Sequence, residues 1–85
     1  MFFMYILKSK KNGKYYIGAT HCLEVRLKQH NAGKIRSTKG LVPLEIVYSE
    51  NYATNSEARK RESYVKRRKS RKFIDALMKK RILTE

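Results

Sequence analysis

Two tyrosines, Tyr5 and Tyr16, lie in aromatic and apolar segments on either side of Asn12-Gly13. An Asn-Gly pair between two strand-like segments is the strongest short-range signal for a β-hairpin. The loop length decides where the phenols point, because side chains alternate between the two faces of a strand. A two-residue loop puts both on one face about 13 Å apart, a four-residue loop (residues 10–13) puts both on one face about 7 Å apart, and a three-residue loop separates them. Neighbouring phenols could take part in phosphodiester chemistry, but tyrosines are also ordinary residues of sheets.

An arginine and a histidine lie beside the apolar face of the helix predicted after this hairpin. At 100° per residue, Leu23 and Leu27 define the apolar stripe, His30 falls inside it, and Arg26 lies at its border. Such polar groups must find a partner or extend to solvent. Two interpretations stay open: a solvent-reaching arginine beside a hydrogen-bonded core histidine, or a phosphate clamp. A guanidinium group suits the second, because it is always charged and can bind two oxygens at once.

Glu62 is the only acid among nine Lys and Arg residues between Arg59 and Lys72. The plain interpretation is an i to i+4 ion pair with Lys66 on one helix face. The alternative is a ligand for a hard divalent cation, which binds carboxylate oxygen and often keeps several waters. The seven acids of the chain are scattered singly, which argues against a site for two metal ions.

Turn signals, capping residues and apolar periodicity predict six elements in the order ββαβαα, within one domain spanning residues 1–85. We expect strands over residues 2–8 and 14–19, a helix capped by Thr20 that starts near His21 and ends by Asn31 to Gly33, and little regular structure over residues 33–42. A third strand of about six residues follows Pro43. A capping box from Thr54 to Glu57 starts a helix to about Lys69, and Ser70 can cap the last helix.

The charge of the chain points to a polyanionic partner. Twenty-one Lys and Arg against seven Asp and Glu give a formal charge of +14 and a pI near 10.2. Such a field attracts nucleic acid, and counterion release adds affinity without reading sequence. No apolar segment reaches the roughly 20 residues of a membrane span, and no signal peptide is predicted. The single cysteine allows no intrachain disulfide, as a reducing cytoplasm would permit, so we expect a cytoplasmic protein.

The ordered series of motifs resembles the GIY-YIG nuclease superfamily, in particular its small stand-alone bacterial branch. Tyr16-Ile17-Gly18 matches the second motif element in full, whereas Phe3-Met4-Tyr5 stands where Gly-Ile-Tyr is expected and keeps only the tyrosine. The resemblance continues to about Leu77 through the following segments: Glu24 to Leu27, His30 to Gly33, Pro43 with Val47 to Glu50, Ser56 to Ala58, and Arg61-Glu62 with Val65-Lys66.

The resemblance implies an α+β fold in which a three-stranded antiparallel sheet is flanked by helices. It also implies metal-dependent hydrolysis of phosphodiester bonds, with one Mg²⁺ ion, or another divalent cation such as Mn²⁺, held by Glu62. Residue by residue, Tyr5 and Tyr16 are the motif tyrosines, Arg26 is the helix arginine, and His30 occupies a position that is often histidine and assists the site. Arg26 would then hold the scissile phosphate, and a tyrosine would take the proton from the attacking water.

Further basic residues are expected to bind the phosphates that flank this site. They lie in the segment from Ser37 to Lys39 and in a cluster made of Lys66, Arg67, Arg68, Lys69, Arg71 and Lys72. We expect DNA rather than RNA as the partner, in a repair or recombination context, with no membrane and no obligate protein partner.

The alternative function is a non-catalytic module that binds DNA or RNA and keeps the fold. Two departures from the family pattern favour it. The first motif element lacks its glycine, and the chain has no asparagine after Asn55, whereas many full nucleases of the superfamily have a late one. A ribosome-associated protein would follow from the charge alone, but it leaves the ordered series of tyrosines, arginine and glutamate without a purpose. The complete series favours the nuclease.

Overall fold

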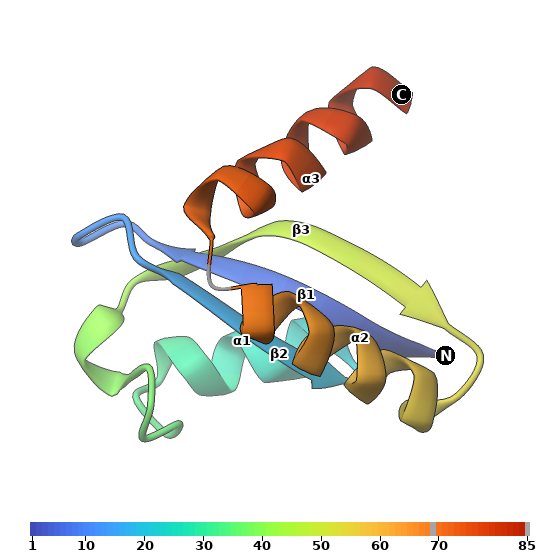
Figure 1. Cartoon of the computed structure of the whole chain (residues 1–85). Helices are drawn as coiled ribbons and strands as arrows, with labels where there is room; N and C mark the ends of the chain where they lie inside the picture. Colours follow the sequence, from blue (N-terminus) through green and yellow to red (C-terminus); the bar gives the residue numbers. More distant parts are fainter. Residues whose placement is uncertain (69, 85) are drawn as a thin grey trace.

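The computed structural model describes residues 1–68 and 70–84. Its elements follow the predicted order ββαβαα, with one short 3₁₀ helix added before the third strand (Figure 1). They are β1 (Phe2–Ser9), β2 (Tyr15–Thr20), α1 (Leu23–Asn31), the 3₁₀ helix (Lys39–Leu41), β3 (Leu44–Tyr52), α2 (Asn55–Arg68) and α3 (Arg71–Thr84). Within the described ranges, none of the helices is long and apolar enough to cross a membrane.

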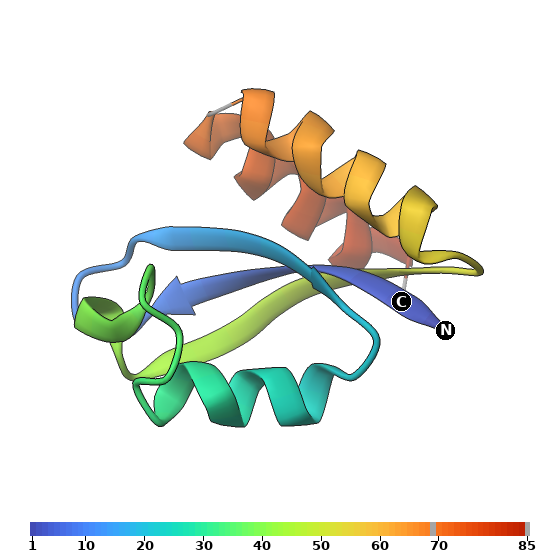
Figure 2. The same ribbon diagram turned by 90° about the horizontal axis from the view of Figure 1, so that it is seen from below.

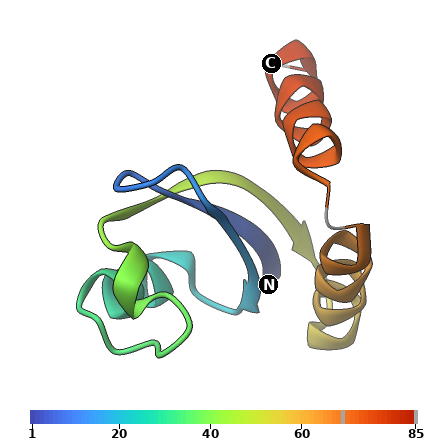
Figure 3. The same ribbon diagram turned by 60° about the vertical axis from the view of Figure 1, so that its left-hand side comes forward.

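The three strands form an antiparallel sheet in the order β2-β1-β3, so the first strand is central. Helix α1 covers one face, and α2 and α3 cover the other (Figure 2). Figure 3 shows the same division, with the 3₁₀ helix on the side of α1. Met4 and Ile6 belong to the cluster that packs with α2 and α3, whereas Tyr5 and Leu7 face α1. All four are at most 2% exposed, because the middle of a central strand is covered on both faces.

The first hairpin has the four-residue loop among the lengths that the sequence left open. Ser9 and Lys14 are the last pair joined by a backbone hydrogen bond, at 2.8 Å, and residues 10–13 turn the chain. Gly13 adopts φ 76°, a left-handed conformation that glycine takes without strain. This register pairs Tyr5 with Gly18, so Tyr5 and Tyr16 lie on one face. The predicted shared face of the two phenols is therefore confirmed.

Local capping signals placed most helix ends correctly. The Thr54 hydroxyl accepts a hydrogen bond from the Glu57 N–H, and the Glu57 carboxylate accepts one from the Thr54 N–H, both at 3.2 Å. Ser70 caps α3 by accepting a hydrogen bond from the Phe73 N–H at 3.2 Å. Helix α1 ends in a Schellman motif, in which Gly33 at φ 75° donates to the His30 carbonyl and Lys34 donates to that of Gln29.

Two boundaries were wrong. Helix α1 begins at Leu23, because the Thr20 hydroxyl accepts from the Cys22 N–H at 3.2 Å and forms a turn before the helix. Strand β3 runs for nine residues, because it pairs with β1 along its whole length. The segment 33–42 has little regular structure, as predicted; it contains one short 3₁₀ helix and a completely buried Thr38.

Candidate active site

His30 lies at the centre of the predicted site, where α1 meets the sheet. Its Nε2 is 2.9 Å from the Tyr5 hydroxyl, and its Nδ1 is 2.7 Å from the Thr38 hydroxyl. The exposed fractions are 0% for His30, 0% for Thr38 and 2% for Tyr5. The Thr38 hydroxyl donates to the Ile35 carbonyl, so we assign the Nδ1 proton to a bond with Thr38. His30 Nε2 then accepts from Tyr5 and fixes its hydroxyl.

Tyr16 also packs against the His30 imidazole. Its ring is 5.2 Å from the His30 ring at 62°, and the Tyr5 ring is 5.9 Å away at 69°. Tyr16 stays half-buried, whereas Tyr5 is enclosed. Tyr5 lies directly over Gly18: a Cβ built there would be 2.5 Å from the Tyr5 hydroxyl oxygen. The glycine of the Tyr16-Ile17-Gly18 motif is thus the residue that lets the buried tyrosine cross β2.

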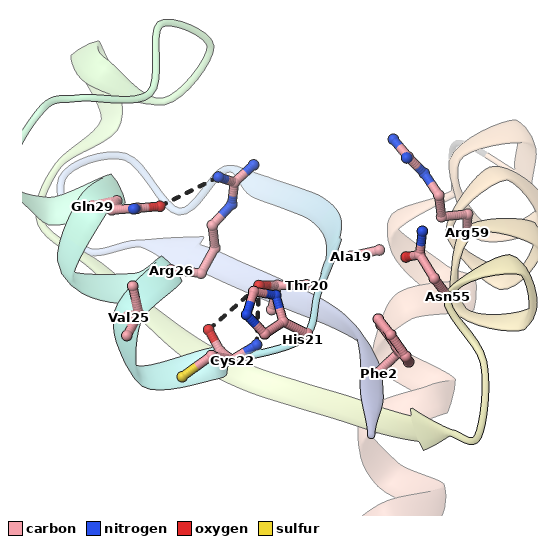
Figure 4. A pocket seen from close by; sticks show the side chains of 10 residues that line it. All are labelled: Phe2, Ala19, Thr20, His21, Cys22, Val25, Arg26, Gln29, Asn55 and Arg59. Carbon is pink, nitrogen blue, oxygen red and sulfur yellow. Dashed lines mark hydrogen bonds between the residues drawn. The ribbon is translucent and has the colours of Figure 1, made fainter.

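Arg26 reaches the same place from the neighbouring turn of α1. Its Nη1 donates to the Gln29 side-chain oxygen at 3.3 Å (Figure 4). Its Nε is buried and has no hydrogen-bond partner within the described part of the chain. A buried donor without an acceptor is costly, which makes this N–H a candidate for binding an acceptor from outside the chain. Of the two tyrosines expected near Arg26, Tyr5 is close enough for the guanidinium to act on the pKa of its hydroxyl.

Burial sets the protonation of the two buried members of the site. Burial raises the pKa of the Tyr5 hydroxyl, the nearby Arg26 guanidinium opposes this shift, and the Glu62 charge adds to it. Burial lowers the pKa of His30, and the positive charge of Arg26 lowers it further. At neutral pH the buried pair is therefore a phenol and a neutral imidazole.

We expect the neutral His30 to make stability depend on pH. Because its pKa in the folded chain lies below the ordinary 6.5, the unfolded chain takes up the proton first as the pH falls. The stability that neutral His30 contributes is complete above pH 6.5, and it is lost as the pH falls from there through the lowered pKa of the folded chain. Urea unfolding between about pH 7.5 and pH 5 should show a decline in wild type. The His30→Gln variant should lack this component, and an equal decline in both proteins would contradict the assignment.

Glu62 joins the site from α2. Its carboxylate forms an ion pair with the Lys66 ammonium at 2.7 Å, and its side chain is 17% exposed. The Lys66 ammonium is also 5.9 Å from the centre of the Tyr16 ring. The i to i+4 pair of the plain interpretation is thus present. Within residues 1–68 and 70–84, no group of three or more His, Cys, Asp or Glu side chains could hold a metal ion.

A second ion pair joins α2 to β3, and no sequence pattern predicted it. Arg61 donates to both oxygens of the Glu50 carboxylate, at 2.9 and 3.2 Å, and the hydroxyls of Tyr48 and Tyr52 donate to the same carboxylate. Burial and the bond to Glu50 raise the pKa of each phenol to about 12. Since Arg61 precedes Glu62, tying α2 to β3 through this cluster helps to hold Glu62 toward the tyrosines.

The predicted phosphate-binding residues divide into two groups. Lys39, Lys66, Arg67 and Lys72 are exposed. Arg68 and Arg71 are exposed but also stack on aromatic rings, Arg68 4.7 Å from the Phe73 ring centre and Arg71 4.8 Å from that of Tyr15. Lys69 lies outside the described residues. The prediction that the segment from Ser37 to Lys39 binds phosphate was wrong for Thr38, because this residue is buried and its hydroxyl is bonded to His30. Nothing in its sequence context marked it, because its partner lies eight residues away.

Comparison with known proteins places this arrangement among nuclease-type domains. A family model described as the GIY-YIG catalytic domain matches residues 1–75. The chain is 37% identical over 68 residues to a UPF0213 protein of Streptococcus pneumoniae, covering 79% of this chain and 68% of the relative. It is 36% identical over 86 residues to a UPF0213 protein of Clostridium perfringens, covering 100% and 91%. The solution NMR structure of a UPF0213 protein from Bacillus halodurans matches with a TM-score of 0.56 at 32% identity, covering 93% and 84%.

Proposed function

We propose, because the chain belongs to the GIY-YIG family, that it is a metal-dependent endonuclease that hydrolyses phosphodiester bonds in DNA. The observation that carries the proposal is the gathering of five side chains from four elements. They come from β1, β2, α1 and α2: Tyr5 and Tyr16 contact His30, Arg26 lies near Tyr5, and Glu62 is linked to the Tyr16 ring through its ion pair with Lys66. Each contact alone could serve the fold. Together, these side chains place an anion-binding group, two phenols and a carboxylate around one site.

The donor set fits a cation that keeps its own waters. Mg²⁺ is often bound by one or two carboxylates together with substrate phosphate oxygens. Glu62 can supply one carboxylate, provided that the Lys66 ammonium releases it. A divalent cation bound there would supply Lewis-acid stabilisation of the departing oxygen.

The side chains of the site would divide the remaining work. Arg26 would bind the scissile phosphate, because its guanidinium holds a buried N–H that has no acceptor among residues 1–68 and 70–84. Tyr5 is too enclosed to meet water, and its bond to His30 makes it a support. Tyr16 is the half-buried phenol, and in its deprotonated, phenolate form it would accept the proton of the attacking water.

A gel assay with branched, single-stranded and duplex DNA, and with RNA duplex, tests the proposal. Cleavage is expected with Mg²⁺ or Mn²⁺ and should stop when a chelator is added. Absence of cleavage of every substrate, with either ion, would contradict it.

One observation favours a second function, a nucleic-acid-binding module without turnover. Glu62 already has a close partner in Lys66, at 2.7 Å, so the carboxylate is satisfied without a cation. The missing late asparagine points the same way. Both functions share the same electrostatic binding.

We expect binding to duplex DNA to weaken steeply as salt rises. Each neutralised phosphate contributes about 0.9 to the slope of log K against log salt, so six to ten contacts would lose about 10³ to 10⁵ in affinity between roughly 50 and 200 mM salt. Fluorescence anisotropy with a labelled duplex measures this slope. The Arg67→Gln variant should reduce it by about one contact. If the affinity of wild type stayed constant over this range of salt, the prediction of mainly electrostatic binding would be wrong.

A further inference from the structure

A pocket of about 430 Å³ opens between α1 and the beginning of α2, beside the candidate site (Figure 4). Phe2, Cys22 and Val25 contribute its apolar lining. Arg26 and Arg59 lie on opposite sides of it and come from α1 and α2 respectively. We call it the Arg26–Arg59 pocket. It thus combines an aromatic and aliphatic surface with two guanidinium groups.

The pocket is continuous with the candidate site on both helices. Arg26 lines the pocket and also lies close to Tyr5. On α2, Arg59 precedes Glu62 by three residues, so the two lie on one face of the helix about one turn apart. Three residues correspond to about 4.5 Å along the helix axis, similar to the axial spacing of about 3.4 Å between successive phosphates of one strand in B-DNA. A strand with one phosphate between Arg26 and Glu62 therefore places its next nucleotide near Arg59.

The chemistry of the lining matches a single nucleotide. Bases stack on aromatic side chains, and arginine pairs with phosphate oxygens. The volume is near the lower end of the range for small-ligand sites, which suits one nucleotide and not a stacked base pair. A base inside a duplex is paired and stacked, so it can enter such a pocket only after extrusion.

We propose that the Arg26–Arg59 pocket binds one unpaired nucleotide next to the phosphate held by Arg26, with its base against Phe2 and its phosphate at Arg59. This inference rests on the proposed function for the position of that phosphate. It assigns a substrate class: nucleic acid with an unpaired nucleotide beside the reacting bond, as in single strands, flaps and branches, in preference to intact duplex.

The test measures binding of the full chain in chelator, so that no cleavage is needed. The probes are a labelled single-stranded oligonucleotide carrying 2-aminopurine and a fully paired duplex of the same length. Phe2→Leu keeps an apolar side chain and removes the ring. Arg59→Gln removes one charge, and Lys60→Gln is its matched control, because Lys60 is exposed on the same helix and is not part of the pocket lining.

Phe2→Leu should weaken single-strand binding about tenfold, since stacking of one base contributes on that scale, and should weaken duplex binding less than about twofold. Arg59→Gln should weaken single-strand binding more than Lys60→Gln does. The 2-aminopurine emission should change on binding to wild type and not to Phe2→Leu. If Phe2→Leu weakened the binding of both probes equally, or if Arg59→Gln and Lys60→Gln weakened single-strand binding equally, the proposed nucleotide binding in this pocket would be wrong. If these differences in binding are observed but no substrate is ever cleaved, the pocket proposal stands and only the proposed nuclease activity is wrong.

Discussion

The Glu62→Gln chain is expected to bind DNA at least as tightly as wild type and to cleave none of it. The substitution removes one negative charge next to a phosphate-binding surface, so repulsion of the nucleic acid falls. Loss of the carboxylate also removes the proposed ligand for a divalent cation, whose Lewis-acid effect would be worth several kcal/mol in the transition state. The Lys66 end of the i to i+4 pair is open to solvent, which limits its contribution to about 0.3–0.5 kcal/mol, so stability should change little.

Lys66→Gln is the matched control, because it breaks the same ion pair at 2.7 Å and leaves the carboxylate in place. If Glu62 served only that pair, both variants would behave alike. The metal role requires that Lys66→Gln still cleaves, although its binding weakens. Calorimetric titration with Mn²⁺ gives a readout besides activity: wild type and Lys66→Gln should take up the ion in the presence of DNA, and Glu62→Gln should not.

Equal cleavage by wild type and Glu62→Gln would refute the metal role. If neither cuts any substrate, the binding module is the better description.

The elements of this fold could be predicted because their signals are local. The reciprocal hydrogen bonds of Thr54 and Glu57 depend on residues three apart, and the left-handed Gly33 ends α1 without help from another element. Such signals act before any tertiary contact forms. The helix start at Leu23 was misjudged for a local reason too, because Thr20 can cap a helix or form a turn, and both satisfy one backbone N–H.

The candidate site was predictable in part. The positions of Tyr5, Tyr16 and Arg26 follow from strand parity and helix periodicity once the loop length is known, and only the structure decides that length. The bonds from His30 to Tyr5 and Thr38 span 25 and 8 residues and carry no periodic signature. The same is true of Glu50 and Arg61, which are eleven residues apart on different elements. Sequence patterns report which face a residue occupies, whereas a hydrogen bond across elements depends on packing that they do not encode.

Gly18→Ala is expected to be the most destabilising small substitution in the site. A Cβ at this position would lie 2.5 Å from the hydroxyl oxygen and 2.6 Å from Cζ of Tyr5. Real Cβ contacts are not that short, so the ring must move. It is 2% exposed and its hydroxyl is bonded to the buried His30, so movement disturbs both residues. Overpacking of this kind costs about 1–3 kcal/mol, and each kcal/mol lowers Tm by roughly 4–8 °C in a domain of this size.

Gly40→Ala separates this contact from the general effect of replacing glycine. Neither residue has a positive φ, and no atom of the described residues lies within 4 Å of a Cβ built at Gly40. Thermal unfolding of Gly40→Ala should therefore match wild type or show a gain of up to about 1 kcal/mol, because alanine restricts the unfolded chain. A double-mutant cycle locates the clash, since Tyr5→Leu lacks the Cζ and hydroxyl atoms that meet the new methyl group. Gly18→Ala should cost less in the Tyr5→Leu background than in wild type. If its cost is the same in both, the ring of Tyr5 is not what requires a glycine in this motif.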